Sequence, residues 1–137
     1  MASVIHLDTH SAVWLHDGDL GRFHPSVLPE LGAAYLMISP MVVLELHYLH
    51  EIGRLIISPQ TMLEAFDQHL AIRICAVPFH DIVSEAAKLT WTRDPFDRII
   101  CATARVAGAP LLTKDGIILV NEPSAFWEHP PVNPGSL

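Results

Sequence analysis

Four carboxylates stand at positions from which they can meet in one cleft. Asp8 and Asp115 each follow a short apolar run typical of a buried strand, and Asp97 lies near the start of an apolar helical pattern. Glu45 has apolar or aromatic neighbours three and four positions away on both sides, which predicts a buried carboxylate in the apolar stripe of a helix. Carboxylate oxygens favour hard divalent cations such as Mg²⁺ or Mn²⁺ over zinc.

Carboxylates that share a cleft repel one another. Two unit charges ~4 Å apart repel by about 4 kcal/mol at an effective dielectric of roughly 20, so such a site takes up protons or recruits cations. One or two divalent ions held in this way can lower the pKa of a water molecule and orient it for attack on a phosphodiester. This chemistry needs no protein nucleophile, and the sequence contains no nucleophile elbow, phosphate-binding loop or dinucleotide-binding glycine motif.

Each acid also has a structural explanation when it is taken alone. Asp97 lies in the first turn of its predicted helix, where the helix dipole favours a negative charge, and Asp94 precedes a proline as helix N-caps often do. Asp8 can cap the helix that follows it, and Asp115 precedes a glycine and can form an ordinary turn. A buried Glu45 can pair with an arginine. Together, however, the four positions favour a shared site.

Four blocks of sequence occur in unbroken order over roughly residues 3 to 120: "HLDTHSAVWL", "ISPMVVLEL", "RDPFDRIICATA" and "LLTKDG". In this order they resemble the PIN-domain ribonucleases, specifically the VapC-type toxins of bacterial toxin–antitoxin pairs. The third block is the most specific, because Asp-Pro-Phe-Asp-Arg before a small-residue helix looks like a family signature. The resemblance implies a Mg²⁺-dependent endoribonuclease in which Mn²⁺ substitutes. It also implies inhibition by a cognate antitoxin protein, and a homodimer that can enter a larger toxin–antitoxin assembly.

The resemblance implies a role for individual residues. By motif, the metal-binding and catalytic acids are Asp8, Glu45, Asp97 and Asp115. Residues that can support the acids, by hydrogen bonding to a carboxylate or to a metal-bound water, are Thr9, Asp94 and Thr113. Residues that can contact RNA phosphates, with a solvated surface charge as the alternative, are Arg93, Arg98 and Lys114. The segment after Asp115, "GIILVNEPSAFW", departs from the family pattern, which places a short helix and a final strand there.

Strands alternate with helices of about 10 to 14 residues, which predicts a three-layer α/β/α PIN-like domain with a central, mostly parallel sheet of four to five strands. The predicted strands are 3–7, 34–39, 71–77 and 109–116, with 117–120 as a fifth candidate. The predicted helices are 11–18, 26–34, 40–53, 59–70, 80–91 and 95–107. Ligands of such folds bind at the carboxyl ends of the strands, where the first and last acids are expected.

Composition sets the broad class. The 137 residues, half apolar and 17% charged, predict one globular domain over 1–137, with residues 130–137 as a mobile tail. A net charge of −7 argues against binding nucleic acid by charge alone. The apolar runs are short of the ~20 residues that span a bilayer, and no signal peptide is recognised. The short apolar runs therefore predict no membrane association. Two cysteines in apolar stretches indicate buried thiols in a reducing compartment, so we expect a cytoplasmic location.

Four alternatives compete with the interpretation as a toxin nuclease. His47, His50 and Glu51 share helical spacing that suits zinc or nickel, but a further ligand at fixed spacing is missing. A haloacid-dehalogenase-like phosphatase would need an acid at position 10, which is His10. A PIN-like domain can also be a housekeeping nuclease without an antitoxin, or an inactive binding module. RNA cleavage with Mg²⁺ and its loss with EDTA separate an active nuclease from the others.

Overall fold

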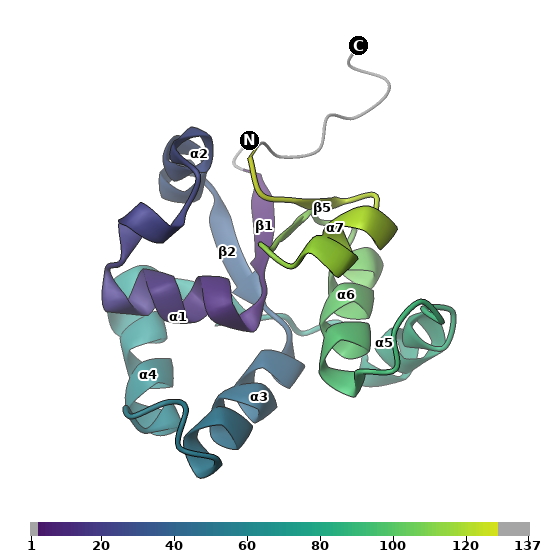
Figure 1. Ribbon diagram of the computed structural model, residues 1–137, viewed down its shortest axis with the longest axis horizontal. Helices are drawn as coiled ribbons and strands as arrows, with labels where there is room; N and C mark the ends of the chain where they lie inside the picture. Colours follow the sequence, from purple (N-terminus) through teal and green to yellow (C-terminus); the bar gives the residue numbers. More distant parts are fainter. Residues whose placement is uncertain (1–2, 129–137) are drawn as a thin grey trace.

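The computed structural model describes residues 3–128, so the predicted mobile tail at 130–137 lies outside the described residues. A five-stranded sheet forms its centre, with strand order β3-β2-β1-β4-β5 (Figure 1). All four strand pairs are parallel. The strands are β1 (Val4–Leu7), β2 (Tyr35–Ile38), β3 (Ile72–Ile74), β4 (Leu111–Leu112) and β5 (Ala125–Phe126).

Helices flank this sheet and confirm the predicted three-layer α/β/α domain. In the view of Figure 1, α1, α2 and α4 lie to one side of β1, and α5, α6 and α7 lie to the other. The helices are α1 (Thr9–Asp17), α2 (Leu28–Ala33), α3 (Pro40–Glu51), α4 (Pro59–Ala65), α5 (Phe79–Ala86), α6 (Pro95–Ala107) and α7 (Gly116–Asn121). No helix within residues 3–128 is long and apolar enough to cross a membrane.

Local sequence explains where several helices begin and end. Ser39 and Ser58 each precede a proline, and each side chain accepts a hydrogen bond from a first-turn amide of α3 or α4. Gly18 and Gly108 end α1 and α6 in the left-handed conformation, with φ of 68° and 67°. The predicted helix 59–70 is instead divided, because α4 continues into a π-helical turn, η3 (Phe66–Leu70), before Ala71 takes a φ of 51°.

The prediction of a fifth strand at 117–120 is wrong. These residues belong to α7, and the fifth strand is β5, which pairs with β4. The physical reason is the side chain of Asp115, which accepts hydrogen bonds from the amides of Ile117 and Ile118 and so starts a helix. A four-residue apolar run does not by itself distinguish a strand from a helix. The short helix and final strand implied by the family pattern are confirmed.

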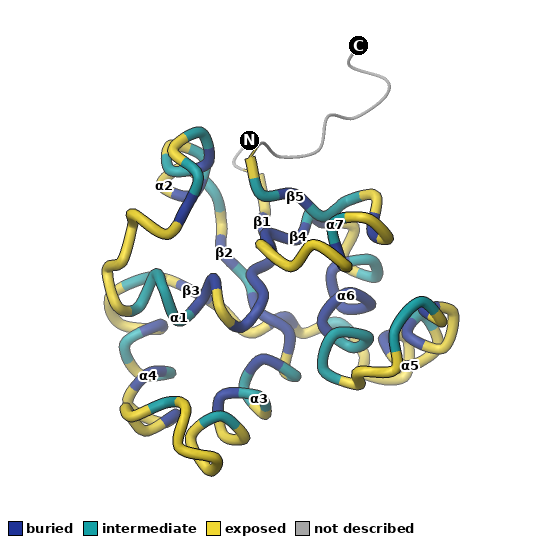
Figure 2. The backbone as a smooth tube through the Cα atoms, viewed as in Figure 1, coloured by how far each residue is buried: buried dark blue, intermediate teal, exposed yellow. Residues whose placement is uncertain are grey.

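The core lies between the sheet and the helices (Figure 2). The inner strands β1, β2 and β4 supply fully buried side chains such as Leu7, Ile38 and Leu112. Cys75 and Cys101 are buried free thiols, as predicted. Arg105 on α6 bridges the carboxylates of Glu85 and Glu122 at 3.2 and 2.8 Å. This network ties α5 and α6 to the end of α7.

Candidate active site

Asp8 lies where β1 ends and α1 begins. Its Oδ1 accepts a hydrogen bond from the Ser11 amide at 2.9 Å, which makes it the N-cap of α1. Its Oδ2 accepts a hydrogen bond of 2.6 Å from the hydroxyl of Thr113, the residue directly after β4. The structural and functional interpretations of Asp8 are therefore compatible, because the cap also fixes the carboxylate at the carboxyl end of the sheet.

Glu45 projects from the second turn of α3. It is half-buried rather than buried, because its carboxylate opens into a cleft instead of the core. Its Oε1 accepts a hydrogen bond from the hydroxyl of Thr9, which follows Asp8 at the start of α1. No arginine within residues 3–128 forms an ion pair with Glu45. The alternative of an internal arginine pair is therefore not observed in the described part of the chain.

Asp94 and Asp97 have different local roles at the start of α6. Asp94 is the N-cap, and its Oδ1 accepts hydrogen bonds from the amides of Phe96 at 2.8 Å and Asp97 at 3.4 Å. Asp97 lies in the first turn and is half-buried, and its carboxylate accepts no hydrogen bond from residues 3–128. The helix therefore uses Asp94 for its own start and leaves the carboxylate of Asp97 available.

Asp115 begins α7 and is exposed. Its backbone amide donates a hydrogen bond of 3.1 Å to the hydroxyl of Thr113, which itself donates to Asp8. The single Thr113 hydroxyl thus connects the segments that carry the first and the fourth predicted acids. Because β1 and β4 are neighbours in a parallel sheet, their carboxyl ends lie at the same edge.

The predicted acids share one open cleft of about 430 Å³ at this edge. They come from four segments: the β1–α1 junction, α3, the start of α6 and the β4–α7 turn. The residues lining the cleft are Asp8, Thr9, His10, Trp14, Glu45, Asp94, Asp97, Ile100, Lys114, Asp115 and Ile118. Five of these are carboxylates, and Lys114 is the one lysine or arginine among them.

The electrostatics of the cleft are those of an overcrowded acidic cluster. Burial raises the pKa of Asp8 above its ordinary value, against the lowering effect of the Thr113 and Ser11 hydrogen bonds. Burial also raises the pKa of Glu45. For Asp97, burial and then the negative charges of the surrounding acids raise the pKa to about 7. The cluster therefore holds more negative charge than its protein surroundings neutralise.

This donor set fits a hard divalent cation. All the candidate ligands are carboxylate oxygens, with the Thr9 and Thr113 hydroxyls held against two of them. Within residues 3–128, no group of three or more His, Cys, Asp or Glu side chains is close enough together to hold a metal ion as it stands. Bringing these carboxylates closer together without a cation would increase their mutual repulsion, which already adds to the effect of burial in raising the pKa of Asp97.

The three residues predicted to contact RNA phosphates lie in different surroundings, and only one of them lines the cleft. Lys114 lines the cleft, and its Nζ lies 5.9 Å from the ring centroid of Trp127. Arg93 is exposed and does not line the cleft. Arg98 turns its guanidinium to the carbonyls of Ala86 and Ala87 at the end of α5, with distances of 3.0 to 3.4 Å. Arg98 therefore serves as a helix C-terminal cation, away from the acids.

Sequence reasoning assigned no site role to His10, Trp14, Ile100 or Ile118, which also line the cleft. His10 and Trp14 lie four residues apart on α1, with ring centroids 5.9 Å apart. Their spacing of four residues, on the helix that Asp8 caps, is the sequence signal that could have identified them. Trp14 further packs against Phe23 and Trp127, so the α1 side of the cleft rests on an aromatic cluster.

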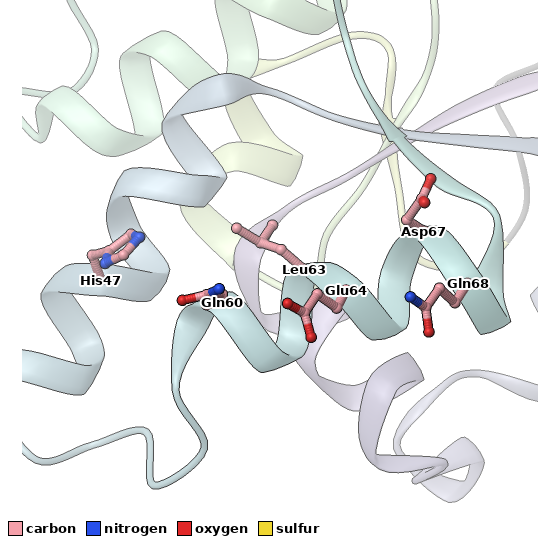
Figure 3. A pocket seen from close by; sticks show the side chains of 6 residues that line it. All are labelled: His47, Gln60, Leu63, Glu64, Asp67 and Gln68. Atoms are coloured by element: carbon pink, nitrogen blue, oxygen red, sulfur yellow. The ribbon is translucent and has the colours of Figure 1, made fainter.

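A second pocket, of about 500 Å³, is separate from the acids. Figure 3 shows His47 on one helix and the other lining residues on the neighbouring one. The lining residues are His47, Gln60, Leu63, Glu64, Asp67 and Gln68. Of the three residues in the transition-metal alternative, His47, His50 and Glu51, only His47 lines this pocket.

The sequence matches the PIN domain family model over residues 5–119, which is most of the chain and includes all four predicted acids. A comparison with curated proteins finds no match.

Solved structures share the fold at low sequence identity. VapBC2 from Rickettsia felis, bound to a DNA fragment from its promoter, matches with a TM-score of 0.62 and 17% identity, over 86% of this chain and 92% of that one. A toxin–antitoxin complex from Klebsiella pneumoniae gives 0.60 and 18%, over 92% and 98%. DNA-bound VapBC from Salmonella typhimurium gives 0.55 and 17%, over 90% and 94%.

Proposed function

Because this chain belongs to the PIN domain family, we propose that it is a Mg²⁺-dependent endoribonuclease and the toxin of a toxin–antitoxin pair. The observation that carries the proposal is the convergence of four acids from four distant segments on one cleft. Nothing in the packing of an α/β domain requires carboxylates to gather there, and their mutual repulsion is unfavourable. A cluster kept at this cost is typical of a site for cations and reaction chemistry.

In the proposed mechanism, the residues that would hold the metal are Asp8, Glu45, Asp97 and Asp115. When bound, Mg²⁺ or Mn²⁺ would lower the pKa of the attacking water and stabilise the leaving oxygen. The chain's own contribution is to orient the carboxylates, although burial raises the pKa values of Asp8, Glu45 and Asp97. Thr113 and Thr9 donate hydrogen bonds to the first two acids, and the positive end of the α6 dipole favours the ionised form of Asp97.

RNA phosphates can approach this cleft only after its charge has been reduced. Lys114 is the residue we propose to contact a phosphate, because it lines the cleft beside the acids. The Arg98 guanidinium is already engaged by α5, and Arg93 lies outside the cleft lining. In a protein whose net charge is −7, a bound divalent cation would reduce the repulsion between the cleft carboxylates and RNA phosphates.

The proposed partners follow from the family and from the acidic character of the chain. The similar solved structures include VapBC and other toxin–antitoxin complexes, which supports a cognate antitoxin for this chain. A basic segment of such a partner is electrostatically suited to the five cleft carboxylates. We also propose a homodimer that can join a larger toxin–antitoxin assembly. A cytoplasmic location suits both an RNA substrate and two buried free thiols.

The decisive experiment measures RNA cleavage by the purified protein with Mg²⁺, with Mn²⁺ and with EDTA. We expect cleavage with either cation and none with the chelator. A matched pair of variants assigns the activity to the cleft: Asp8→Asn should abolish cleavage, whereas Asp81→Asn, an exposed acid on α5, should not change it. If the folded wild-type protein cleaves no RNA with either cation, the nuclease proposal is wrong and an inactive binding module is favoured.

The toxin assignment needs a separate test. The reading frame next to this one should encode a small protein with a DNA-binding N-terminal part, and its product should copurify with this chain and suppress cleavage. An active nuclease without such a neighbour would be a housekeeping enzyme instead.

A further inference from the structure

Trp127 lies outside the part of the chain that matches the family model, which ends at residue 119. It directly follows β5. Its ring stacks on Phe23, with the ring centroids 5.6 Å apart and the planes inclined by 24°. It also meets the ring of Trp14 edge-on, with centroids 6.0 Å apart. Because Phe23 is only 4% exposed, these contacts anchor the ring of Trp127 to the body of the domain.

The amino group of Lys114 lies over this anchored ring. Its Nζ is 5.9 Å from the ring centroid of Trp127, within the roughly 6 Å over which an aromatic face attracts a cation. Lys114 also lines the acid cleft together with five carboxylates. Within residues 3–128, however, it forms no ion pair with any of them. In the described part of the chain, the amino group therefore faces the tryptophan ring and not a carboxylate.

This placement matters because the cleft attracts positive charge. Lysine carries its charge on a flexible four-carbon stem, and Asp115 is the next residue in the sequence. An ammonium group that swung in among the acids would neutralise charge that a divalent cation needs. Its own N–H donors would then be unavailable to an RNA phosphate. A contact that holds the end of the stem to one side keeps the acids and the amino group separate.

We propose that Trp127 is a positioning residue, which holds the amino group of Lys114 at the side of the cleft and away from the carboxylates. The acids then remain available to a divalent cation, and the amino group remains available to a phosphate. The proposal rests on the nuclease function proposed above. It gives a role in the site to a residue beyond the family match, which otherwise serves only to complete the packing on Phe23.

The first test measures Mn²⁺ binding by isothermal titration calorimetry, without RNA. Trp127→Leu keeps apolar bulk but removes the aromatic face, and it should raise the Kd for Mn²⁺ by up to about fivefold. Loss of an exposed cation–π contact shifts the balance between two lysine positions by no more than this. Trp127→Phe keeps an aromatic face and should stay close to wild type. The matched control is Trp91→Leu, since Trp91 does not line the cleft and should leave Kd unchanged.

A double-mutant cycle shows whether Trp127 acts through Lys114. Lys114→Met removes the competing ammonium group, so it should tighten Mn²⁺ binding more in the Trp127→Leu background than in the wild type. Equal effects in the two backgrounds would mean that Trp127 does not control the lysine, and would overturn the proposal. A folded Trp127→Leu variant with the wild-type Kd would overturn it as well, and would leave Trp127 a packing residue.

Steady-state cleavage of a short single-stranded RNA at saturating Mg²⁺ supplies the second test. Trp127→Leu should raise KM and change kcat little, because the lysine contacts substrate without taking part in the chemistry, and Trp127→Phe should restore KM. A fall in kcat at unchanged KM would overturn the positioning role. If the wild type cleaves no RNA while the Mn²⁺ cycle shows the expected coupling, the nuclease proposal is overturned and the role of Trp127 stands.

Discussion

Thr113 donates a hydrogen bond of 2.6 Å to Oδ2 of Asp8, although the two residues are 105 positions apart in the sequence. The bond joins the carboxyl ends of the neighbouring parallel strands β1 and β4. Both partners are buried, at 0% and 9% exposure. The hydroxyl also accepts a hydrogen bond from the Asp115 amide, so it orients two of the proposed catalytic segments at once.

We therefore expect Thr113→Val to impair both stability and cleavage. Valine has nearly the shape of threonine but leaves Oδ2 of the buried Asp8 carboxylate without a donor, which should cost about 1–3 kcal/mol of unfolding free energy. Cleavage should fall because Asp8 is no longer held in one orientation. Chemical denaturation and RNA cleavage measure the two effects. Thr113→Ser retains the hydroxyl and should recover most of both, and equal behaviour of the Ser and Val variants would show that the bond is unimportant.

The raised pKa of Asp97 predicts that this acid lowers the free energy of unfolding by an amount that depends on pH. Its pKa is about 7 in the folded protein against an ordinary value of 3.8, so between these values the folded state retains a proton that the unfolded state releases. Stability from this group is present below pH ~4 and is lost as the pH rises to about 7. Asp97→Asn should therefore raise Tm by roughly 3–6 °C above pH ~7 in EDTA, and by nothing near pH ~4.

Thermal unfolding of both proteins across this pH range is the measurement. His6, whose pKa burial lowers to about 4, titrates in the same window, but it is common to both proteins and cancels in their difference. Added Mg²⁺ should narrow the gap, because the ion stabilises the folded wild type more than the variant. Glu51→Gln removes an exposed acid at the end of α3 and serves as the charge control. A Tm gain that does not vary with pH would contradict the prediction.

The two aspartates at the start of α6 should respond differently to substitution. Asp94→Ala should destabilise the protein by about 1 kcal/mol through loss of the N-cap, whereas Asp94→Asn keeps a capping oxygen and should be nearly neutral. Because the Asp94 charge helps to raise the pKa of Asp97, Asp94→Asn should lower that pKa. NMR titration of the Asp97 carboxyl and the rate of RNA cleavage test this. Asp94→Asn should still cleave, and a complete loss of activity would instead make Asp94 essential.

Arg105 should be important for stability and unimportant for the chemistry. Glu122 is only 3% exposed and depends on this guanidinium, so Arg105→Met leaves a buried charge unpaired and should cost about 3–5 kcal/mol. Replacing both partners, as Arg105→Met with Glu122→Leu, should recover most of that loss. Unfolding free energies of the two variants decide the point. Specific activity of the folded double variant should equal that of the wild type, and a lower value would link this network to the cleft.

The meeting of the four acids in one cleft could be predicted from the sequence, whereas their catalytic role stays a prediction. Asp8, Glu45, Asp97 and Asp115 could be selected because strand ends and helix faces have recognisable patterns, and parallel strands gather their carboxyl ends. The sequence predicts that the Thr113 hydroxyl can bond to a carboxylate, but it does not predict that the carboxylate is that of Asp8. The partner of this hydroxyl depends on β1 and β4 being neighbours, which local sequence does not encode.

Other features depend on tertiary context to a greater degree. The apolar run at 117–120 by itself favours a strand, whereas Asp115 caps these residues as a helix. The predicted helix 59–70 gave no sign of the π-helical turn at its end. Trp14 was assigned only to a helix, since its place in the cleft lining depends on contacts with Phe23 and Trp127 from remote segments.

The pairing of β1 with β4 also determines when a newly made chain can become active. Strand β1 leaves the ribosome first, but its neighbour β4 and the acid at position 115 are synthesised some hundred residues later. Until then the sheet lacks its central pairing and the cleft lacks one side. A chain that stops before residue 115 therefore has no assembled cleft, so any nuclease activity of this protein requires synthesis to extend past β4 and Asp115.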